Sequence, residues 1–387
     1  MHLRARRSTA TLRTFASAAA LPLALGTLPI GAHAQTPPGW QSCAAESNDT
    51  ARLACYDAWA RGSAPPPAAE APAVPRNEAP ANNDGQPALV ARQEPAPVQG
   101  AGGCHDTAYS ELSRFWELER ATGCGVFGIR SYRPISLSVI GSDTVNQQPT
   151  SENPLNNAPT ALPYRTTETR IQLSVRSKLA EGLITQGDLR DSLWFGYTQQ
   201  SSWQLFTGAL SRPFRNTDHE PEFIYVHPLQ RPSSDGWRLR YGGVGLVHQS
   251  NGQSLPLSRS WNRVYLMAGA ERGGLSLQGR VWQRLNEDPA TDDNPGISDY
   301  IGRAEAIAIW RLVDGQTVAF TLRHSLREQA NGSMKLEWML PIGGEHGASA
   351  PSSMRLHAQL FSGYGDSLLD YNRRRTVLSL GLSLVDW

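Results

Sequence analysis

A histidine, a serine and an asparagine lie close together near the middle of the 387-residue chain. His248 and Ser250 are two residues apart in LVHQSNG, and Asn262 follows the loop NGQSLPLSRS. A serine hydroxyl is a weak nucleophile until a base takes its proton, and an imidazole two positions away in an extended strand can do so. An asparagine can hold that imidazole in the required tautomer. The spacing therefore indicates nucleophilic catalysis, although a polar strand end that enters a turn has the same letters.

Alternation along two strands predicts where these side chains point. Val244 and Leu246 share the face of His248 and Ser250, because successive side chains of a strand alternate. On the next strand, Asn262 shares a face with two apolar residues, Val264 and Leu266. If this apolar face meets lipid, polar side chains on it are costly unless they serve a function.

The backbone of the same stretch offers groups for the reaction. The N–H groups of Ser250 and Gly252 are candidate donors to an oxyanion, since they lie at the strand end and in the turn that follows.

Two-residue alternation continues through residues 127–387, as in RLHAQLF and VLSLGLSL. Asp314 and Gly315 mark a hairpin turn between AIAIWRL and QTVAFTL. Twelve strands would leave about 22 residues each, enough for strands of about 9–11 residues plus a connection. The pattern predicts an all-β fold, an antiparallel transmembrane β-barrel of about twelve strands with a short N-terminal periplasmic extension.

A soluble β-sandwich is the alternative, because its strands also alternate. Three features favour the barrel: an export signal, leucine stripes without helix-length apolar runs, and the ending LSLVDW, which suits a closing strand with an interfacial aromatic residue.

The first 34 residues have the composition of a signal peptide. A basic start is followed by the apolar run FASAAALPLALGTLPIG and by AHA, which predicts cleavage after Ala34. An uncleaved membrane anchor is the alternative. Together with the barrel, this segment predicts a bacterial outer-membrane location.

The four cysteines fall in two close pairs, Cys43 with Cys55 and Cys104 with Cys124. Three connectivities are possible in an exported chain, and we expect each cysteine to pair with its neighbour. No C-x-x-C spacing occurs, so a zinc site is not expected.

Composition divides the chain into four parts. After the signal peptide (1–34) we expect a small cysteine-containing helical segment (35–61), a Pro/Ala-rich linker (62–103) and the barrel (104–387). The formal net charge of +1 gives no reason to expect a nucleic-acid partner.

The stretch HQSNGQSLPLSRSWNR resembles the active-site signature of the outer-membrane phospholipase A family. Further similar stretches are WELERATGCGVFGIRSYRP, YTQQSSWQL, RPFRNTDHEPE and FSGYGDSLLDYN, so the resemblance covers about residues 112–387. It implies a twelve-stranded barrel that hydrolyses acyl esters of membrane glycerophospholipids, with phospholipase A1, phospholipase A2 and lysophospholipase activity. Ser250 would be the nucleophile, His248 the general base and Asn262 the group that orients the base.

The resemblance also implies a calcium ion and a homodimer. The ligands would be the backbone carbonyl of Gln253, the hydroxyl of Ser258 and Ser211 from a second subunit. Calcium takes about 6–8 oxygens, so waters would complete the shell. Because residues 251–260 contain no carboxylate, we expect calcium and dimerisation to favour each other. A non-catalytic barrel that acts as a pore or transporter is the alternative function.

Overall fold

The computed structural model describes residues 43, 47–62, 103–232, 235–312, 314–342 and 354–384. The expected signal peptide, nearly all of the expected linker and the last three residues lie outside these ranges.

The described part of the N-terminal unit includes the helix α2 (Asp49–Gly62). The Asn48 side chain accepts hydrogen bonds from the backbone N–H groups of Thr50 and Ala51, which is the usual way to satisfy free donors at a helix start. A disulfide joins Cys43 to Cys55, and a second one, in the other unit, joins Cys104 to Cys124. The expected pairing of neighbouring cysteines is confirmed.

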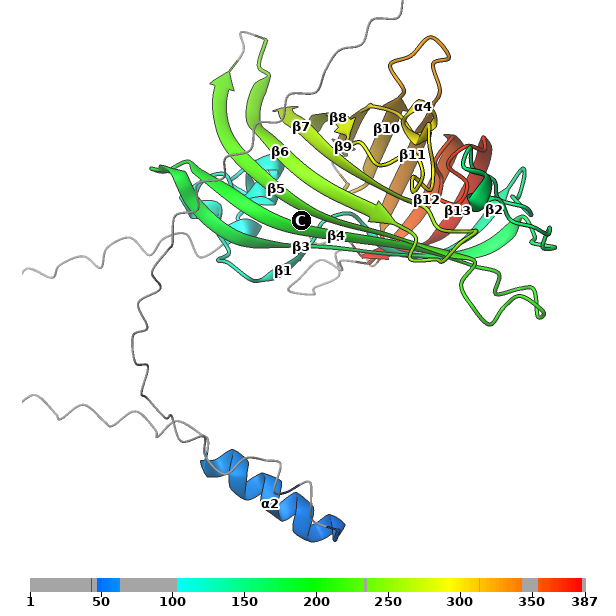
Figure 1. Cartoon of the computed structure of the whole chain (residues 1–387). Helices are drawn as coiled ribbons and strands as arrows, with labels where there is room; N and C mark the ends of the chain where they lie inside the picture. The colour runs from blue at the N-terminus through cyan, green and yellow to red at the C-terminus, as the bar shows by residue number, and fades with distance from the viewer. Residues whose placement is uncertain are drawn as a thin grey trace, which may run out of the picture. The chain divides into compact units, whose positions relative to one another are not determined.

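The second unit is a closed barrel (Figure 1). Strands β2 to β13 pair antiparallel in chain order, and β13 pairs with β2 to close the sheet, so the expected twelve strands are confirmed. The strands are β2 (Ile135–Ser142), β3 (Thr167–Gln186), β4 (Arg190–Trp203), β5 (Asn216–Pro232), β6 (Arg238–Ser250), β7 (Ser260–Arg272), β8 (Leu275–Arg284), β9 (Ala304–Arg311), β10 (Thr317–His324), β11 (Gly332–Pro341), β12 (Met354–Gly363) and β13 (Arg375–Leu384).

Short elements accompany the barrel strands. A three-residue strand, β1 (Ile129–Ser131), pairs with β3. The helices are η1 (Gly103–His105), α3 (Glu111–Trp116), η2 (Arg120–Thr122), η3 (Pro154–Asn156) and α4 (Ile297–Tyr300). None of the described helices is long and apolar enough to cross a membrane.

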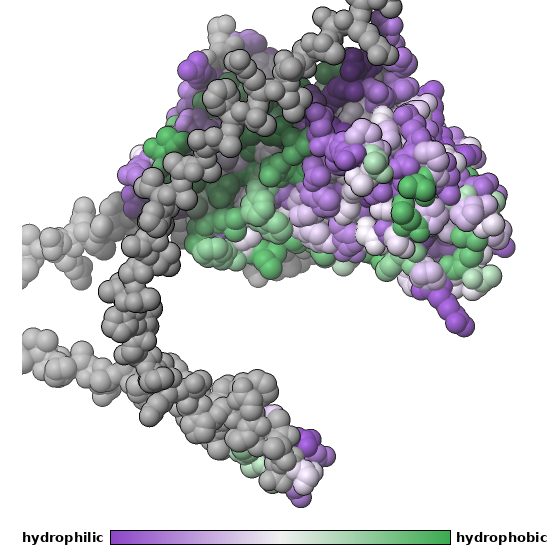
Figure 2. Space-filling model, viewed as in Figure 1, coloured by the Kyte–Doolittle hydropathy of each residue, from purple (hydrophilic) through white to green (hydrophobic). Residues whose placement is uncertain are grey.

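The outer surface of the barrel is apolar. Leu246, Leu266 and Leu380 are 50%, 62% and 57% exposed, and similar leucine, valine, phenylalanine and tryptophan side chains are exposed on nearly every strand. Figure 2 shows hydrophobic residues gathered over the outer face of β3 to β5, with hydrophilic ones at the hairpin tips. A water-exposed sheet would not present such a continuous apolar face, so this surface is the lipid-facing one.

The inner surface carries the charges. Arg263 and Glu220 form an ion pair of 3.2 Å, and both side chains are nearly buried. Arg323 and Glu305 form another, at 2.8 Å. Buried charges are stable only when they are paired and hydrogen-bonded, and the lumen side chains provide opposite charges and hydrogen-bond partners.

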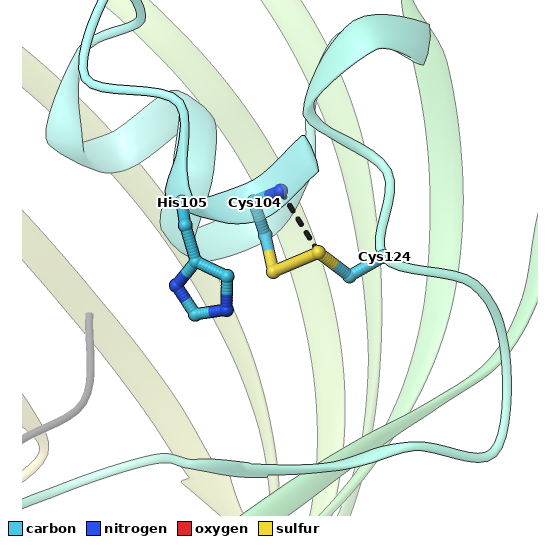
Figure 3. A group of neighbouring side chains, drawn as sticks. All are labelled: Cys104, His105 and Cys124. Carbon is cyan, nitrogen blue, oxygen red and sulfur yellow. Dashed lines mark hydrogen bonds between the residues drawn. A yellow bond between two sulfur atoms is a disulfide. The ribbon is translucent and has the colours of Figure 1, made fainter. Parts of the chain in front are cut away.

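A short helix packs inside the lumen. Trp116 of α3 is fully buried, and its ring lies 5.8 Å from that of Trp194 and 5.7 Å from that of Tyr241, measured between ring centroids. The disulfide between Cys104 and Cys124 ties the chain before α3 to the chain after η2 (Figure 3). Two-residue alternation did not predict that this helix packs in the lumen, because its aromatic partners Trp194 and Tyr241 come from different strands.

The connections at one end of the barrel include the long segments 143–166, 204–215, 251–259, 285–303 and 364–374. The other end includes short turns such as 187–189 and 273–274. The C-terminal end of β6 and the start of β7 belong to the end with long connections, so loops surround His248, Ser250 and Asn262.

A charge on the outer face should destabilise the barrel in lipid. Leu380 lies in the middle of β13, and we expect Leu380→Arg to lower the free energy of unfolding in bilayers by about 2–4 kcal/mol. Urea titration of bilayer-embedded protein measures this, with Leu380→Ala as the control. Equal stability of the two variants would place this face in water.

Candidate active site

The β6–β7 hairpin brings the candidate residues together. His248 is the register partner of Asn262, and Ser250 is that of Ser260. The buried Asn251 holds the connection between β6 and β7. Its side chain accepts from the Arg259 N–H at 2.9 Å and donates to the Leu257 carbonyl at 2.8 Å.

His248 and Asn262 are hydrogen-bonded across the two strands. His248 Nδ1 lies 2.9 Å from Asn262 Oδ1. An amide oxygen only accepts, so Nδ1 carries the hydrogen and Nε2 keeps its lone pair. His248 is therefore held in the tautomer that can take a proton at Nε2.

Ser250 lies on the same outer face as His248, two residues further along β6. This spacing separates their Cα atoms by about 6.7 Å, a distance that two side chains can bridge. Among the described residues, no hydrogen bond joins the Ser250 hydroxyl to His248, so only the histidine–asparagine link is formed in this structure.

Asn262 has a second polar partner that the sequence did not reveal. Its Nδ2 donates to Glu287 Oε1 at 3.4 Å, and its backbone carbonyl accepts from the Leu285 N–H at 2.8 Å. Burial raises the pKa of the Glu287 carboxyl, while Arg284 acts to lower it. Glu287 lies in the connection between β8 and β9, where the stretch LNEDP carries no recognisable motif.

Ser258, an expected calcium ligand, lies beside a carboxylate. Its hydroxyl donates to Asp293 Oδ2 at 2.6 Å. Asn156 Nδ2 donates both to the Ser258 carbonyl and to Asp293 Oδ1, at 3.0 Å each. No acidic residue occurs in 251–260, and the carboxylate beside Ser258 comes instead from the stretch TDDN in the connection between β8 and β9.

The Gln253 side chain is hydrogen-bonded to the start of β5. Its Nε2 donates to the Arg215 carbonyl and to Asn216 Oδ1, at 3.2 and 3.3 Å. The expected contribution of its backbone carbonyl to a metal site stays a prediction.

Among the described residues, no hydrogen bond joins Ser211 to Ser258. Its hydroxyl donates to the Gly208 carbonyl at 3.3 Å, and its own carbonyl accepts from Trp203 Nε1 at 2.7 Å. We expect Ser211 to act from a second subunit, and the single chain leaves that expectation untested.

An open groove of about 430 Å³ is lined by Asn251 and Gly252, the two residues that follow Ser250. His219 lies opposite Ser250 on β5, and its Nδ1 is 2.7 Å from the Tyr197 hydroxyl. Both apolar and polar side chains line the groove, among them those of Tyr164, Phe214, His219, Gln253 and Leu257. Gly252 has a φ of +62°, a conformation that favours glycine and leaves its amide at the groove.

Another group of metal-ligand types lies at Cys104, His105 and Cys124 (Figure 3). Both sulfur atoms belong to the disulfide, so neither is a thiolate. Metal ligation by cysteine needs the thiolate, and this group does not fit a metal as it stands.

A closed antiparallel barrel with an apolar outside and a charged inside belongs to the class of transmembrane β-barrels, and this one presents a histidine–asparagine pair and a serine on its outer face. The family model for phospholipase A1 matches residues 112–384. The chain belongs to the phospholipase A1 family and is a phospholipase, as the resemblance implied.

Individual relatives agree with this assignment. A Neisseria meningitidis protein, provisionally named phospholipase A1, is 35% identical over 89% of this chain and 90% of its own length. Phospholipase A1 of Escherichia coli is 36% identical over 57% of this chain and 71% of its own.

Solved structures show the same barrel. Outer membrane phospholipase A from Escherichia coli superposes with a TM-score of 0.57 at 30% identity, covering 66% of this chain and 94% of that one. The Salmonella typhi outer membrane phospholipase dimer with bound calcium gives a TM-score of 0.57 at 29% identity, covering 67% and 93%.

Proposed function

We propose that this phospholipase hydrolyses the acyl ester bonds of glycerophospholipids, including lysophospholipids, with Ser250, His248 and Asn262 on its lipid-facing surface. The observation that carries the proposal is the hydrogen bond between His248 and Asn262, which holds the base with Nε2 free on the face shared by Ser250. A lipid substrate reaches this face by diffusing within the membrane leaflet.

The reaction follows from these groups. Ser250 Oγ attacks the ester carbonyl while its proton passes to His248 Nε2, and the same proton then leaves with the lysophospholipid alcohol. Water, deprotonated by His248, hydrolyses the acyl-serine and releases the fatty acid. The backbone N–H groups of Ser250 and Gly252 would donate to the oxyanion. The aromatic packing of α3 in the lumen does not favour the pore or transporter alternative.

We further propose calcium as the cofactor. Ser258 Oγ, an Asp293 oxygen and the Gln253 carbonyl are hard oxygen donors, and the Asp293 carboxylate supplies the charge that calcium prefers. A bound calcium ion would place positive charge beside the developing oxyanion. The calcium in the Salmonella typhi relative supports this proposal.

The remaining proposals concern assembly and location. A second copy of the chain would add Ser211 to the calcium site and enclose the acyl chain, and the dimeric Salmonella typhi relative supports such a homodimer. Residues 1–34 would direct export to the bacterial outer membrane, with 35–61 as a small helical segment and 62–103 as the linker to the barrel at 104–387.

Removing reacting groups should abolish hydrolysis without unfolding the barrel. We expect Ser250→Ala and His248→Ala to lower kcat by at least about a thousandfold, and Asn262→Ala by less, because it orients the base and does not react. Fatty-acid release from phospholipid micelles measures this. Wild-type turnover by folded Ser250→Ala would refute the assignment.

Loss of the charged oxygen should weaken calcium binding. Asp293→Asn should raise the calcium concentration for half-maximal activity by about tenfold, because calcium affinity depends on ligand charge. Titration of activity with free calcium measures this, and Glu328→Gln, an exposed acid on another connection of the same end, is the control. An unchanged midpoint would remove Asp293 from the site.

Activity should depend on how densely the barrels are packed. If a partner completes the calcium site, specific activity rises with protein-to-detergent ratio, and crosslinking rises with calcium, because linked equilibria favour each other reciprocally. Chelation should reduce both. A monomeric, calcium-free sample with full activity contradicts the proposal.

A further inference from the structure

The connection between β8 and β9 contacts every second residue from Ser258 to Asn262, across the junction of the preceding loop and β7. Asp293 accepts from the Ser258 hydroxyl at 2.6 Å, Asn294 Oδ1 accepts from the Ser260 N–H at 2.9 Å, and Glu287 accepts from Asn262 at 3.4 Å. The connection therefore lies along the segment 258–262, which includes the Asn262 that is hydrogen-bonded to His248.

Asn262 poses an orientation problem that an aspartate would not. Its amide has an accepting oxygen and a donating nitrogen of nearly the same size. With the amide turned over, Nδ2 would face His248 Nδ1 and the imidazole hydrogen would move to Nε2. Nε2 could then no longer take the serine proton.

Glu287 supplies the asymmetry that prevents this. A carboxylate only accepts, so it draws Nδ2 toward itself and leaves Oδ1 for His248. Its other oxygen accepts from Arg284 Nη2 at 3.3 Å, and the same nitrogen donates to Asp292 Oδ1 at 2.7 Å. The Glu287 side chain is only 20% exposed, so its position is fixed by packing as well as by charge.

The backbone fixes the same geometry. The Leu285 N–H donates to the Asn262 carbonyl at 2.8 Å, which places the chain two residues before Glu287 directly beside Asn262. Asn262 is thus held at its main chain and at its side chain by one connection.

We propose that Glu287 is a positioning residue for the hydrolysis: it orients the Asn262 amide and so sets the tautomer of His248. This inference rests on the proposed function of Ser250, His248 and Asn262. Among the described residues, Glu287 has no hydrogen bond to Ser250 or His248, so it would act through Asn262.

The test is a double-mutant cycle with Asn262→Asp. Glu287→Ala should lower kcat by about tenfold with little change in KM, the effect of one hydrogen bond. In the Asn262→Asp background the same substitution should leave kcat unchanged or raise it, because either carboxylate oxygen can accept from His248 and the repulsion from Glu287 disappears. Glu287→Gln keeps the side-chain size but adds a donating nitrogen, so its kcat should fall between those of the wild type and Glu287→Ala. Glu328→Ala, an exposed acid elsewhere on the same end, is the matched control.

A second readout does not depend on turnover. Nitrogen-15 NMR of the His248 ring should show the Nδ1–H tautomer in the wild type and a mixture in Glu287→Ala. If Glu287→Ala lowers the yield of folded barrel, Glu287→Met keeps the side-chain volume without the carboxylate and replaces it in both measurements.

The outcomes separate this inference from the function on which it rests. An equal fall in kcat in the wild-type and Asn262→Asp backgrounds, or an unchanged tautomer, overturns the role of Glu287 even when Ser250→Ala is inactive. Full activity of Ser250→Ala overturns the proposed function itself, whatever Glu287 does.

Discussion

The closure of the sheet between β13 and β2 is the constraint on which the rest of the structure depends. A membrane core offers no hydrogen-bond partners, so a sheet that crosses it can leave no edge unpaired. Once the sheet is closed, each strand has one face toward lipid and one toward the lumen. The exposed leucines outside and the buried Arg263–Glu220 pair inside follow from that division.

The same division explains why the polar site is conspicuous. His248 and Ser250 stand on the face of Val244 and Leu246, where a polar group has few partners. His248 finds one only because its register partner across the hairpin is Asn262. The strands thus bring His248 and Asn262 together, and the turn at Gly252 lines the groove beside them.

Loops at one end complete what the strands begin. The connection between β8 and β9 brings Glu287 to Asn262 and Asp293 to Ser258. Arg284, the last residue of β8, forms ion pairs with Glu287 and Asp292 of this connection. A single connection therefore serves both the hydrogen-bonded pair and the oxygen cluster proposed for calcium. Displacement of this segment would disturb both sites together.

The sequence by itself determined the strands and the common face of His248, Ser250 and Asn262, because two-residue alternation and hairpin register are local properties. It left three disulfide connectivities open, and the structure forms the expected pairing of neighbours. Only the tertiary structure decided the rest. Glu287 is 25 residues from Asn262, and Asp293 is 35 residues from Ser258. No periodicity relates residues so far apart, so their contacts depend on how an irregular connection folds over the barrel rim. The packing of α3 in the lumen was hidden for the same reason: its partners Trp194 and Tyr241 come from different strands and meet only when the barrel closes.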